Sequence, residues 1–452
     1  MKTKHEVLKL DPEGILPEID VQFVTLRSSV PKGIEYLIDI VDFKNKKLDR
    51  WTVPFIYING AKDTIKNVIY KDKKLPFNYT DYLEYYVSQF QTPHVCQLSP
   101  QGILFMSFGV TDVGFASLIL DTNTGSTKLI QGKNEHRLHS SGGDFNEDYT
   151  KWYFTCWPPT NKKKHVRINP AETWVCSIDL NTLEEECEAH IVDKVDNGIF
   201  LDAIPQQHHH MSISADERFI VATSFENAPI IPFPDCTPEE DPEGFKRTHE
   251  AGMRLEGLLT IDLATNKYWN TPIPIPSVGH VEYDLDDPYV GYVSAHNICA
   301  ITQGTILEGP AGIFKFKIFD GHTEIIGAYT NDHLFRITQH SVFKYEGETL
   351  LGVTVTPNKL VLIKAEDMSL WREFELFPAE PIKIEGCGVI DYKHPHGAYS
   401  LNPSKDGRYI VLESSLDFYI YDLKENCILE ERVSRQVPEG YAGEGHTRSL
   451  GM

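Results

Sequence analysis

The stretch Ser404-Lys405-Asp406-Gly407-Arg408-Tyr409-Ile410-Val411-Leu412-Glu413, followed by Asp417–Asp422, decides the fold of this chain. A polar turn containing Asp-Gly leads into an apolar strand, and a second strand then ends in an aspartate, as in consecutive antiparallel strands. Seven copies of a hydrophobic strand that runs into a polar turn occur along the sequence. The other six are Tyr36–Asp42, Ala116–Asp121, Thr173–Asp179, Gly257–Asp262, Gly312–Asp320 and Lys359–Asp367.

The spacing of these repeats predicts a β-propeller. A blade of four strands needs about 40 to 50 residues, and the repeats are roughly 50 to 80 residues apart, which leaves room for variable loops. We therefore expect an all-β fold, a single seven-bladed β-propeller over residues 1–452 with a central channel lined by histidines. The first repeat has no inner strand upstream, so the N- and C-terminal segments are expected to complete its blade. Long polar stretches such as Lys44–Phe90 are predicted to be surface insertions.

The composition restricts the partners and the location of the protein. The formal net charge is −22, from 43 basic and 65 acidic residues, which disfavours nucleic acid and anionic membranes as partners. No apolar stretch approaches the ~18 residues that a membrane span needs, and no secretion signal is recognisable, so we expect a cytoplasmic protein. Eight cysteines without CxxC spacing indicate reduced, mostly packed thiols.

Histidines recur at one position of the repeat, in the innermost strand of the blades. Inner strands converge on the channel mouth, so these side chains are expected to share one small site, although each is distant from the next in sequence. Two explanations remain open: a metal or catalytic centre, or structural histidines that bridge neighbouring blades by hydrogen bonds, as in WD-repeat propellers. The histidines are His94, His139, His209, His280, His340 and His396, with His446 in the C-terminal tail.

The segment His394-Pro395-His396 is the most specific feature of this set. Two imidazoles one residue apart share a face of an extended strand, and the proline between them cannot donate to a strand ladder. The pair is therefore expected at the entrance of a strand, where both rings can turn to one ion. Imidazole suits Fe²⁺, Zn²⁺ and Cu²⁺ as well as Mn²⁺, and an added carboxylate favours Mn²⁺.

These segments resemble those of the oligogalacturonate lyases over about residues 90–425. His394-Pro395-His396 with Gly397-Ala398-Tyr399-Ser400 resembles the segment that carries two metal-binding histidines in that family, and Thr338-Gln339-His340 resembles the segment of a third. Gly279-His280 resembles the segment of the catalytic base. One departure is Ser294-Ala295-His296-Asn297, where the family has a Cys-His-Glu-Gly-Pro signature.

The resemblance implies a cytoplasmic, seven-bladed, metal-dependent lyase that cleaves a short uronate-containing oligosaccharide by β-elimination. It implies a divalent metal, Mn²⁺ in the first place, held by His340, His394 and His396, together with Asp391, which occupies the place of a glutamine ligand of the family and can bind a hard divalent ion. It also implies His280 as the catalytic base and Arg254 as a contact to a substrate carboxylate.

Two other classes of function remain open on the residues themselves. A histidine-bound metal in a propeller also suits an oxygenase or isomerase acting on another small molecule, and a propeller without metal can serve as a binding scaffold. The expected partner is a small-molecule or oligosaccharide substrate, and the sequence leaves the oligomeric state open. Metal identity and elimination activity distinguish the three classes.

Overall fold

The computed structural model describes residues 3–29, 35–54, 93–111, 114–130, 138–139, 142–157, 172–192, 195–196, 199–200, 210–223, 257–275, 278–296, 305–306, 310–331, 336–356, 359–376, 382–384, 388–390, 400–414, 417–429, 432–439, 441–442 and 446–447. All regular elements within these ranges are β-strands, which confirms the predicted all-β class. Over the same ranges, no helix of the length and apolarity needed to cross a membrane is found.

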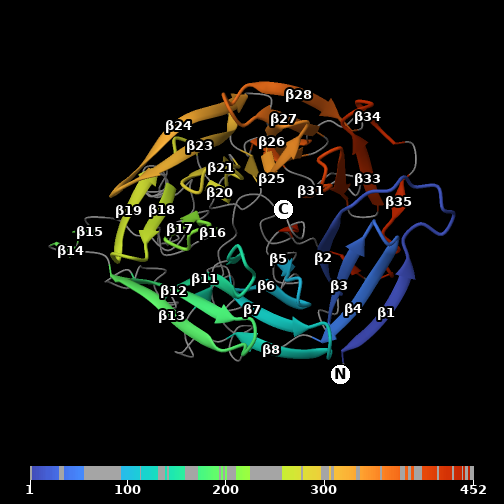
Figure 1. Ribbon diagram of the computed structural model, residues 1–452, viewed down its shortest axis with the longest axis horizontal. Helices are drawn as coiled ribbons and strands as arrows, with labels where there is room; N and C mark the ends of the chain where they lie inside the picture. The colour runs from blue at the N-terminus through green and yellow to red at the C-terminus, as the bar shows by residue number, and fades with distance from the viewer. Residues whose placement is uncertain are drawn as a thin grey trace.

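The strands form seven blades that follow one another around a ring in chain order, with the first blade beside the last (Figure 1). This confirms the prediction of a seven-bladed β-propeller. Blades one to three consist of β1 (Lys4–Lys9), β2 (Gln22–Ser29), β3 (Glu35–Asp42) and β4 (Lys47–Pro54); β5 (Pro93–Leu98), β6 (Ile103–Thr111), β7 (Gly114–Asp121) and β8 (Ser126–Ile130); and β9 (Leu138–His139), β10 (Asp144–Phe145), β11 (Lys151–Trp157), β12 (Glu172–Asp179) and β13 (Glu185–Val192).

Blades four to seven repeat the same antiparallel order. They consist of β16 (Met211–Ile213), β17 (Phe219–Thr223), β18 (Gly257–Asp262) and β19 (Lys267–Pro272); β20 (Val278–Tyr283), β21 (Val290–Ala295), β23 (Ala311–Phe319) and β24 (His322–Asn331); β25 (Arg336–Tyr345), β26 (Glu348–Thr356), β27 (Lys359–Lys364) and β28 (Leu370–Glu375); and β31 (Ser400–Pro403), β32 (Tyr409–Glu413), β33 (Asp417–Asp422), β34 (Cys427–Ile428) and β35 (Val433–Ser434).

The predicted repeats lie in β3, β7, β12, β18, β23, β27 and β33, and each of these is a strand of a different blade. The interpretation of Lys44–Phe90 as one insertion is wrong at its beginning, because Lys47–Pro54 forms β4 and pairs with β3 along its whole length. Alternating burial along β4 explains the difference, since one face of this polar-looking segment packs into the blade. Residues 55–92 lie outside the described residues.

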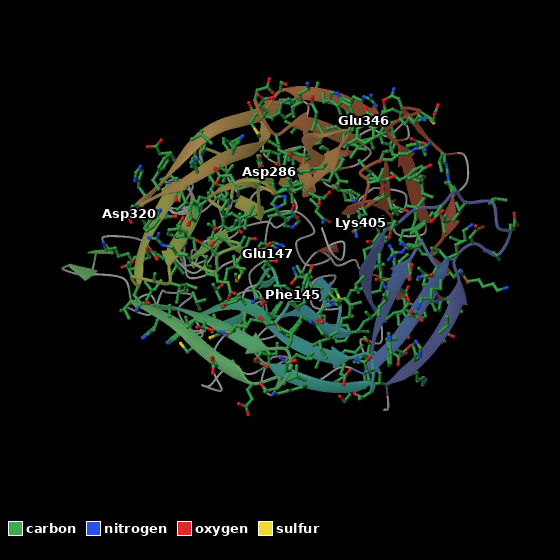
Figure 2. All side chains as sticks on the ribbon, viewed as in Figure 1. Phe145, Glu147, Asp286, Asp320, Glu346 and Lys405 are labelled. Atoms are coloured by element: carbon green, nitrogen blue, oxygen red, sulfur yellow. The ribbon has the colours of Figure 1, made fainter. Side chains whose placement is uncertain are left out.

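The turn that led to the fold prediction is stabilised by its own side chains. Ser404 Oγ donates to Asp406 Oδ1 at 2.5 Å and accepts from the Tyr409 backbone N–H at 2.9 Å, while Arg408 pairs with Asp422 at 2.7 Å. Figure 2 marks the equivalent first turns of blades five, six and seven with Asp286, Glu346 and Lys405. The fourth blade has the same contacts among Ser214, Asp216, Arg218, Phe219 and Asp262.

The hydrophobic core is divided into seven clusters within the described residues, and each cluster lies between two neighbouring blades. Val24 and Leu104 belong to the cluster between blades one and two, for example, and Phe23 packs edge-on against Phe418, with ring centroids 5.5 Å apart, between blades seven and one. Because an apolar interface exists at every blade boundary, including the last with the first, burial of apolar surface closes the ring.

Segments from the two ends of the chain lie in the first blades. β1 pairs with β4 at the outer edge of the first blade, and β36 (Tyr441–Ala442) pairs with β2 on its inner side. β37 (His446–Thr447) then runs parallel to β5 in the second blade. The assignment of residues 1–452 to one domain stays a prediction.

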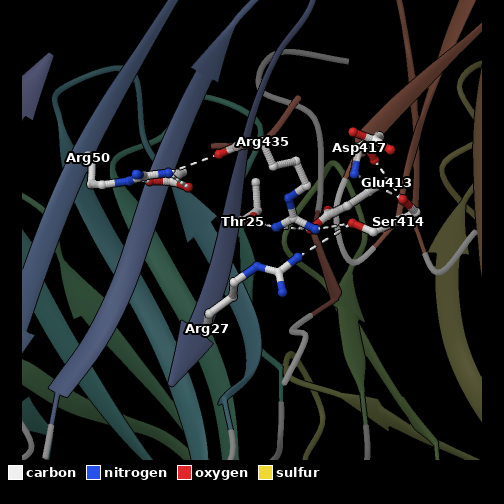
Figure 3. Close-up of polar contacts among 8 residues, drawn as sticks. Thr25, Arg27, Arg50, Glu413, Ser414, Asp417 and Arg435 are labelled. Atoms are coloured by element: carbon white, nitrogen blue, oxygen red, sulfur yellow. Dashed lines mark hydrogen bonds and ion pairs between the residues drawn. The ribbon is translucent and has the colours of Figure 1, made fainter. Parts of the chain in front are cut away.

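A buried polar network joins the last blade to the first (Figure 3). Arg435, which is fully buried, lies just after β35, and its guanidinium is 2.7 Å from Glu413 Oε1. The same guanidinium donates to the carbonyl of Ser414 and to the hydroxyl of Thr25 in β2. Arg50 of β4 in turn donates to the carbonyl of Arg435 at 3.0 Å. Because charges inside a protein need partners, these contacts hold the C-terminal segment against the first blade.

Candidate functional site at one end of the channel

Three innermost strands are interrupted by β-bulges near their first residues. The register of β5 against β6 shifts between Pro93 and Cys96, that of β20 against β21 between Val278 and Val281, and that of β25 against β26 between Ile337 and Gln339. His94 and His280 lie inside the first two bulges, and His340 follows the third. A bulge turns side chains away from the regular pleat, so β20 does not present His280 with ordinary strand alternation.

A buried hydroxyl on the second strand supports each of these irregular segments, and the same arrangement is found at the start of the fourth blade. In the second blade, the backbone N–H of Val95 donates to Ser107 Oγ at 3.2 Å. The backbone N–H of His280 donates to Ser294 Oγ at 2.9 Å, and that of His210 donates to Thr223 Oγ1 at 3.0 Å. In the sixth blade, Thr354 Oγ1 donates to the carbonyl of Gln339 at 3.2 Å. Side-chain hydroxyls thus replace ladder bonds where the strands depart from regular pairing.

Four buried histidines gather across blades four, five and six. The ring of His280 contacts that of His210, with centroids 4.1 Å apart and planes at 75°, and lies edge-on to His296, with centroids 5.4 Å apart. The centroid of His340 is 6.4 Å from that of His280. Each of the four side chains is at most 4% exposed. His280 is therefore the centre of a histidine cluster, defined here as His210, His280, His296 and His340.

The strand directions place this cluster at one end of the channel. The innermost strands β16, β20 and β25 lie nearest the centre of the ring in Figure 1. His210 precedes β16 and His280 lies near the start of β20, whereas His296 follows the end of β21, which runs back antiparallel to β20. The turn at Asp286 that joins β20 to β21 lies at the opposite end of the same hairpin.

Two rings of the histidine cluster lie close to glycines that leave space for them. A Cβ atom at Gly279 would lie 1.6 Å from His296 Nε2, and one at Gly142 would lie 2.7 Å from His210 Nδ1. His296 Nδ1 also hydrogen-bonds to the carbonyl of Ile337 in β25. His296 therefore joins blades five and six, which is the structural role that the alternative explanation of the inner histidines assigns to them.

The predicted site residues divide into three groups. His280 and His340 belong to the histidine cluster. For His94, His139 and His446 the structure describes only the backbone, in β5, β9 and β37, where His446 pairs with Val95. The remaining predictions lie outside the described residues and stay predictions: His209, Arg254, Asp391, His394 and His396.

The donor chemistry of the site suits a divalent metal. His340 is fully buried at the channel end, and the three further ligands implied by the resemblance all belong to residues 391–399. Three imidazoles and one carboxylate suit first-row divalent ions, and the carboxylate favours Mn²⁺. Among the residues that the structure describes, no three or more histidine, cysteine, aspartate or glutamate side chains form a group able to hold a metal ion. A metal held by His340 would therefore need ligands from outside the described residues, and the resemblance names Asp391, His394 and His396 for this role.

Two members of the cluster were not predicted from the sequence. His210 belongs to the run His208-His209-His210, and the pairing of its backbone with Thr223 identifies it as the member that contacts His280. His296 directly follows the second strand of its blade, β21, rather than lying in the first. The available sequence signal was its position two residues after Ser294, a buried hydroxyl residue of the repeat.

The fold and the site together define a class: a seven-bladed β-propeller with buried histidines at one end of its channel. No family model and no curated protein sequence matches the chain. Among solved structures, the chain is similar to an oligogalacturonate lyase in complex with manganese, at 14% identity and a TM-score of 0.42, over 77% of this chain and 79% of that one. It is also similar to the dihydro-heme d1 dehydrogenase NirN in complex with DHE, at 11% identity and a TM-score of 0.44, over 97% of this chain and 79% of that one.

Proposed function

We propose that the protein is a metal-dependent lyase that cleaves a short uronate-containing oligosaccharide by β-elimination. The observation that carries the proposal is the position of His280, a buried imidazole at a β-bulge in the middle of the histidine cluster. A base held by its neighbours in one orientation is what abstraction of a carbon-bound proton requires.

His280 would take the proton α to the uronate carboxylate. Its backbone N–H is held by Ser294, and its ring is in contact with His210, so the strand and the ring are both positioned before substrate binds. Histidine has an unperturbed pKa near ~6.5, which leaves much of the imidazole able to accept a proton near neutral pH. The C–O bond to the neighbouring sugar then breaks and leaves a 4,5-unsaturated product.

His340, His394, His396 and Asp391 would hold the divalent ion. When bound, such an ion neutralises the substrate carboxylate and stabilises the charge that develops as the proton leaves. Arg254 would pair with a carboxylate of the substrate in a bidentate manner. These cationic groups would offset locally the net charge of −22, which otherwise repels an anionic sugar.

The test separates metal binding from chemistry. His280→Ala is expected to keep the metal content of the wild type and to lower the rate of elimination by about 10² to 10⁴, because a positioned base contributes this much. His396→Ala is expected to lose both metal and activity. Metal content is measured by elemental analysis, and turnover of oligogalacturonate by the ultraviolet absorbance of the conjugated product.

His322→Ala is the matched control, because His322 is an exposed histidine on the outer strand β24, hydrogen-bonded to Glu324 at 3.1 Å. This variant should leave both the metal content and the rate of elimination unchanged. Near-normal elimination by His280→Ala would overturn the assignment of the base. If the purified protein holds a redox-active ion, consumes O₂ and shows no elimination, it is an oxygenase and the lyase proposal is wrong.

A further inference from the structure

Three cysteines lie side by side on the three outer strands of the third blade. Cys156 is in β11, Cys176 in β12 and Cys187 in β13, and β12 is the middle strand of the three. Cys156 and Cys176 are buried, whereas Cys187 is exposed. The three thiols therefore form a row from the core to the surface, which the expectation of mostly packed, inert thiols does not explain.

Contacts join the three thiols in pairs. The Sγ atoms of Cys156 and Cys176 are 3.5 Å apart. Cys176 and Cys187 are directly opposite in the register of β12 and β13, next to a bulge between Val175 and Cys176. Hydrogen bonding by Cys156, opposed by a hydrogen bond from Cys187, raises the pKa of the Cys176 thiol. Cys176 thus has a sulfur neighbour on each side.

The strand geometry permits a disulfide between Cys176 and Cys187. Directly opposed residues of antiparallel strands have Cα atoms about 4.5 to 5.5 Å apart, and a disulfide requires about 4.4 to 6.8 Å. The register therefore places the two cysteines at a separation that a disulfide can span.

The exposed end of the row is strongly acidic. Cys187 lies within the sequence Glu184-Glu185-Glu186-Cys187-Glu188, and Lys151 pairs with Glu188 at 2.9 Å. The carboxylates of this segment repel anionic oxidants such as glutathione disulfide, but they do not hinder an uncharged peroxide. The surface therefore selects for a small neutral oxidant.

We propose that these three cysteines form a redox-responsive site, in which a peroxide oxidises Cys187 and Cys176 then closes a reversible disulfide with it. In the first step the Cys187 sulfur attacks one peroxide oxygen, the O–O bond breaks, and the products are a sulfenic acid and water. In the second step the Cys176 sulfur attacks the Cys187 sulfur and the S–O bond breaks. The hydroxide leaves with the thiol proton as a second water.

Cys156 gives the disulfide a route into the core. Its sulfur lies on the other side of Cys176 from Cys187, so it can attack the Cys176 sulfur and release Cys187 as a thiol. This exchange involves no net oxidation, and it moves the disulfide from the surface of the blade to its buried strands. A small dithiol restores all three thiols.

The experiment is peptide mapping of the full-length protein after treatment with hydrogen peroxide and alkylation. Trypsin leaves Cys176 and Cys187 in one peptide, Ile168–Lys194, so their disulfide removes two hydrogens from its mass, whereas a Cys156–Cys176 disulfide links two tryptic peptides. We expect one or both products in the wild type, only the first in Cys156→Ser, and neither after reduction with dithiothreitol.

Cys187→Ser should slow disulfide formation at Cys176 by about tenfold or more, because the oxidant then has no exposed thiol in the row. Cys427→Ser is the matched control, since Cys427 is an exposed thiol in the seventh blade, and it should behave as the wild type. Two results would overturn the proposal. The first is that Cys187 becomes a sulfinic acid, or forms a disulfide between two chains, while Cys176 can still be alkylated. The second is that Cys187→Ser forms the disulfide at Cys176 as fast as the wild type. Equal melting temperatures would show that both serine variants are folded.

Discussion

At the scale of single residues, the absence of a side chain at Gly279 makes room for the histidine cluster. Gly279 lies next to His280 in the bulge of β20, and it leaves the space that the ring of His296 occupies. His296 cannot move freely, since its Nδ1 is hydrogen-bonded to the carbonyl of Ile337 in the next blade. Any larger residue at position 279 therefore displaces an anchored ring that contacts His280.

We predict that Gly279→Ala destabilises the protein by about 1–3 kcal/mol, as overpacking of a buried site does, and also lowers the activity that depends on His280. Urea unfolding and the elimination assay measure the two effects. Gly327→Ala on β24 is the control, because the atom nearest to a Cβ there would be Cγ of the flexible Met368 side chain, at 3.0 Å. Equal stability of the two variants would contradict the steric account of the cluster.

At the scale of elements, the hairpin of the two inner strands is the unit that holds the histidines. Thr223 of β17 accepts from the backbone N–H of His210 at 3.0 Å and donates to the carbonyl of Gly279 in the next blade at 2.5 Å. One hydroxyl thus connects the histidine segments of blades four and five. Ser107 of β6 and Ser294 of β21 accept backbone N–H groups in the corresponding way.

We predict that Thr223→Val lowers the free energy of unfolding by about 1–3 kcal/mol, because it leaves a buried N–H and a buried carbonyl without this partner. Thr223→Ser keeps the hydroxyl. Its free energy of unfolding should fall by less than that of the valine variant, although serine has the smaller side chain. Urea denaturation of both variants tests the difference. If the valine variant is the more stable of the two, packing of the methyl group outweighs the hydrogen bonds, and the role given to the hydroxyl is wrong.

At the scale of the whole molecule, the ring is closed between the last and the first blades by an apolar cluster and a buried polar network. The ion pair of Arg435 and Glu413 lies at this boundary, with both side chains at most 1% exposed. Buried pairs contribute little net stability against apolar residues of similar size, but the loss of one partner leaves a charge without compensation.

We predict that Arg435→Met lowers the free energy of unfolding by about 3–5 kcal/mol and that the double change Arg435→Met with Glu413→Leu recovers part of this loss. Lys344→Met is the control, because its ion pair with Asp286 is exposed and should be worth less than about 1 kcal/mol. Thermal and urea unfolding provide the measurements. If the double variant is less stable than Arg435→Met, the decrease in the free energy of unfolding comes from lost packing rather than from the uncompensated charge.

The sequence predicted the number of blades because a blade is specified locally. Continuously buried strands, a turn such as Ser404–Gly407 and an aspartate at the end of the third strand all depend on residues close together in the chain. The same local pattern placed His280 and His340 in innermost strands, and both belong to the histidine cluster. Local patterns were misleading where polar residues alternate with buried ones, as in Lys47–Pro54.

By itself, then, the sequence determined the repeated strands and placed His280 and His340 in innermost strands, since both follow from hydrogen bonding and burial between neighbouring strands. Only the tertiary structure decided that His210 contacts His280, that His296 joins them from a second strand, and that Cys187 connects to the core through Cys176. These contacts depend on register and on the packing of one blade against the next. Register is set by bulges and buried hydroxyls that act across strands, and a shift by one residue turns a side chain to the opposite face.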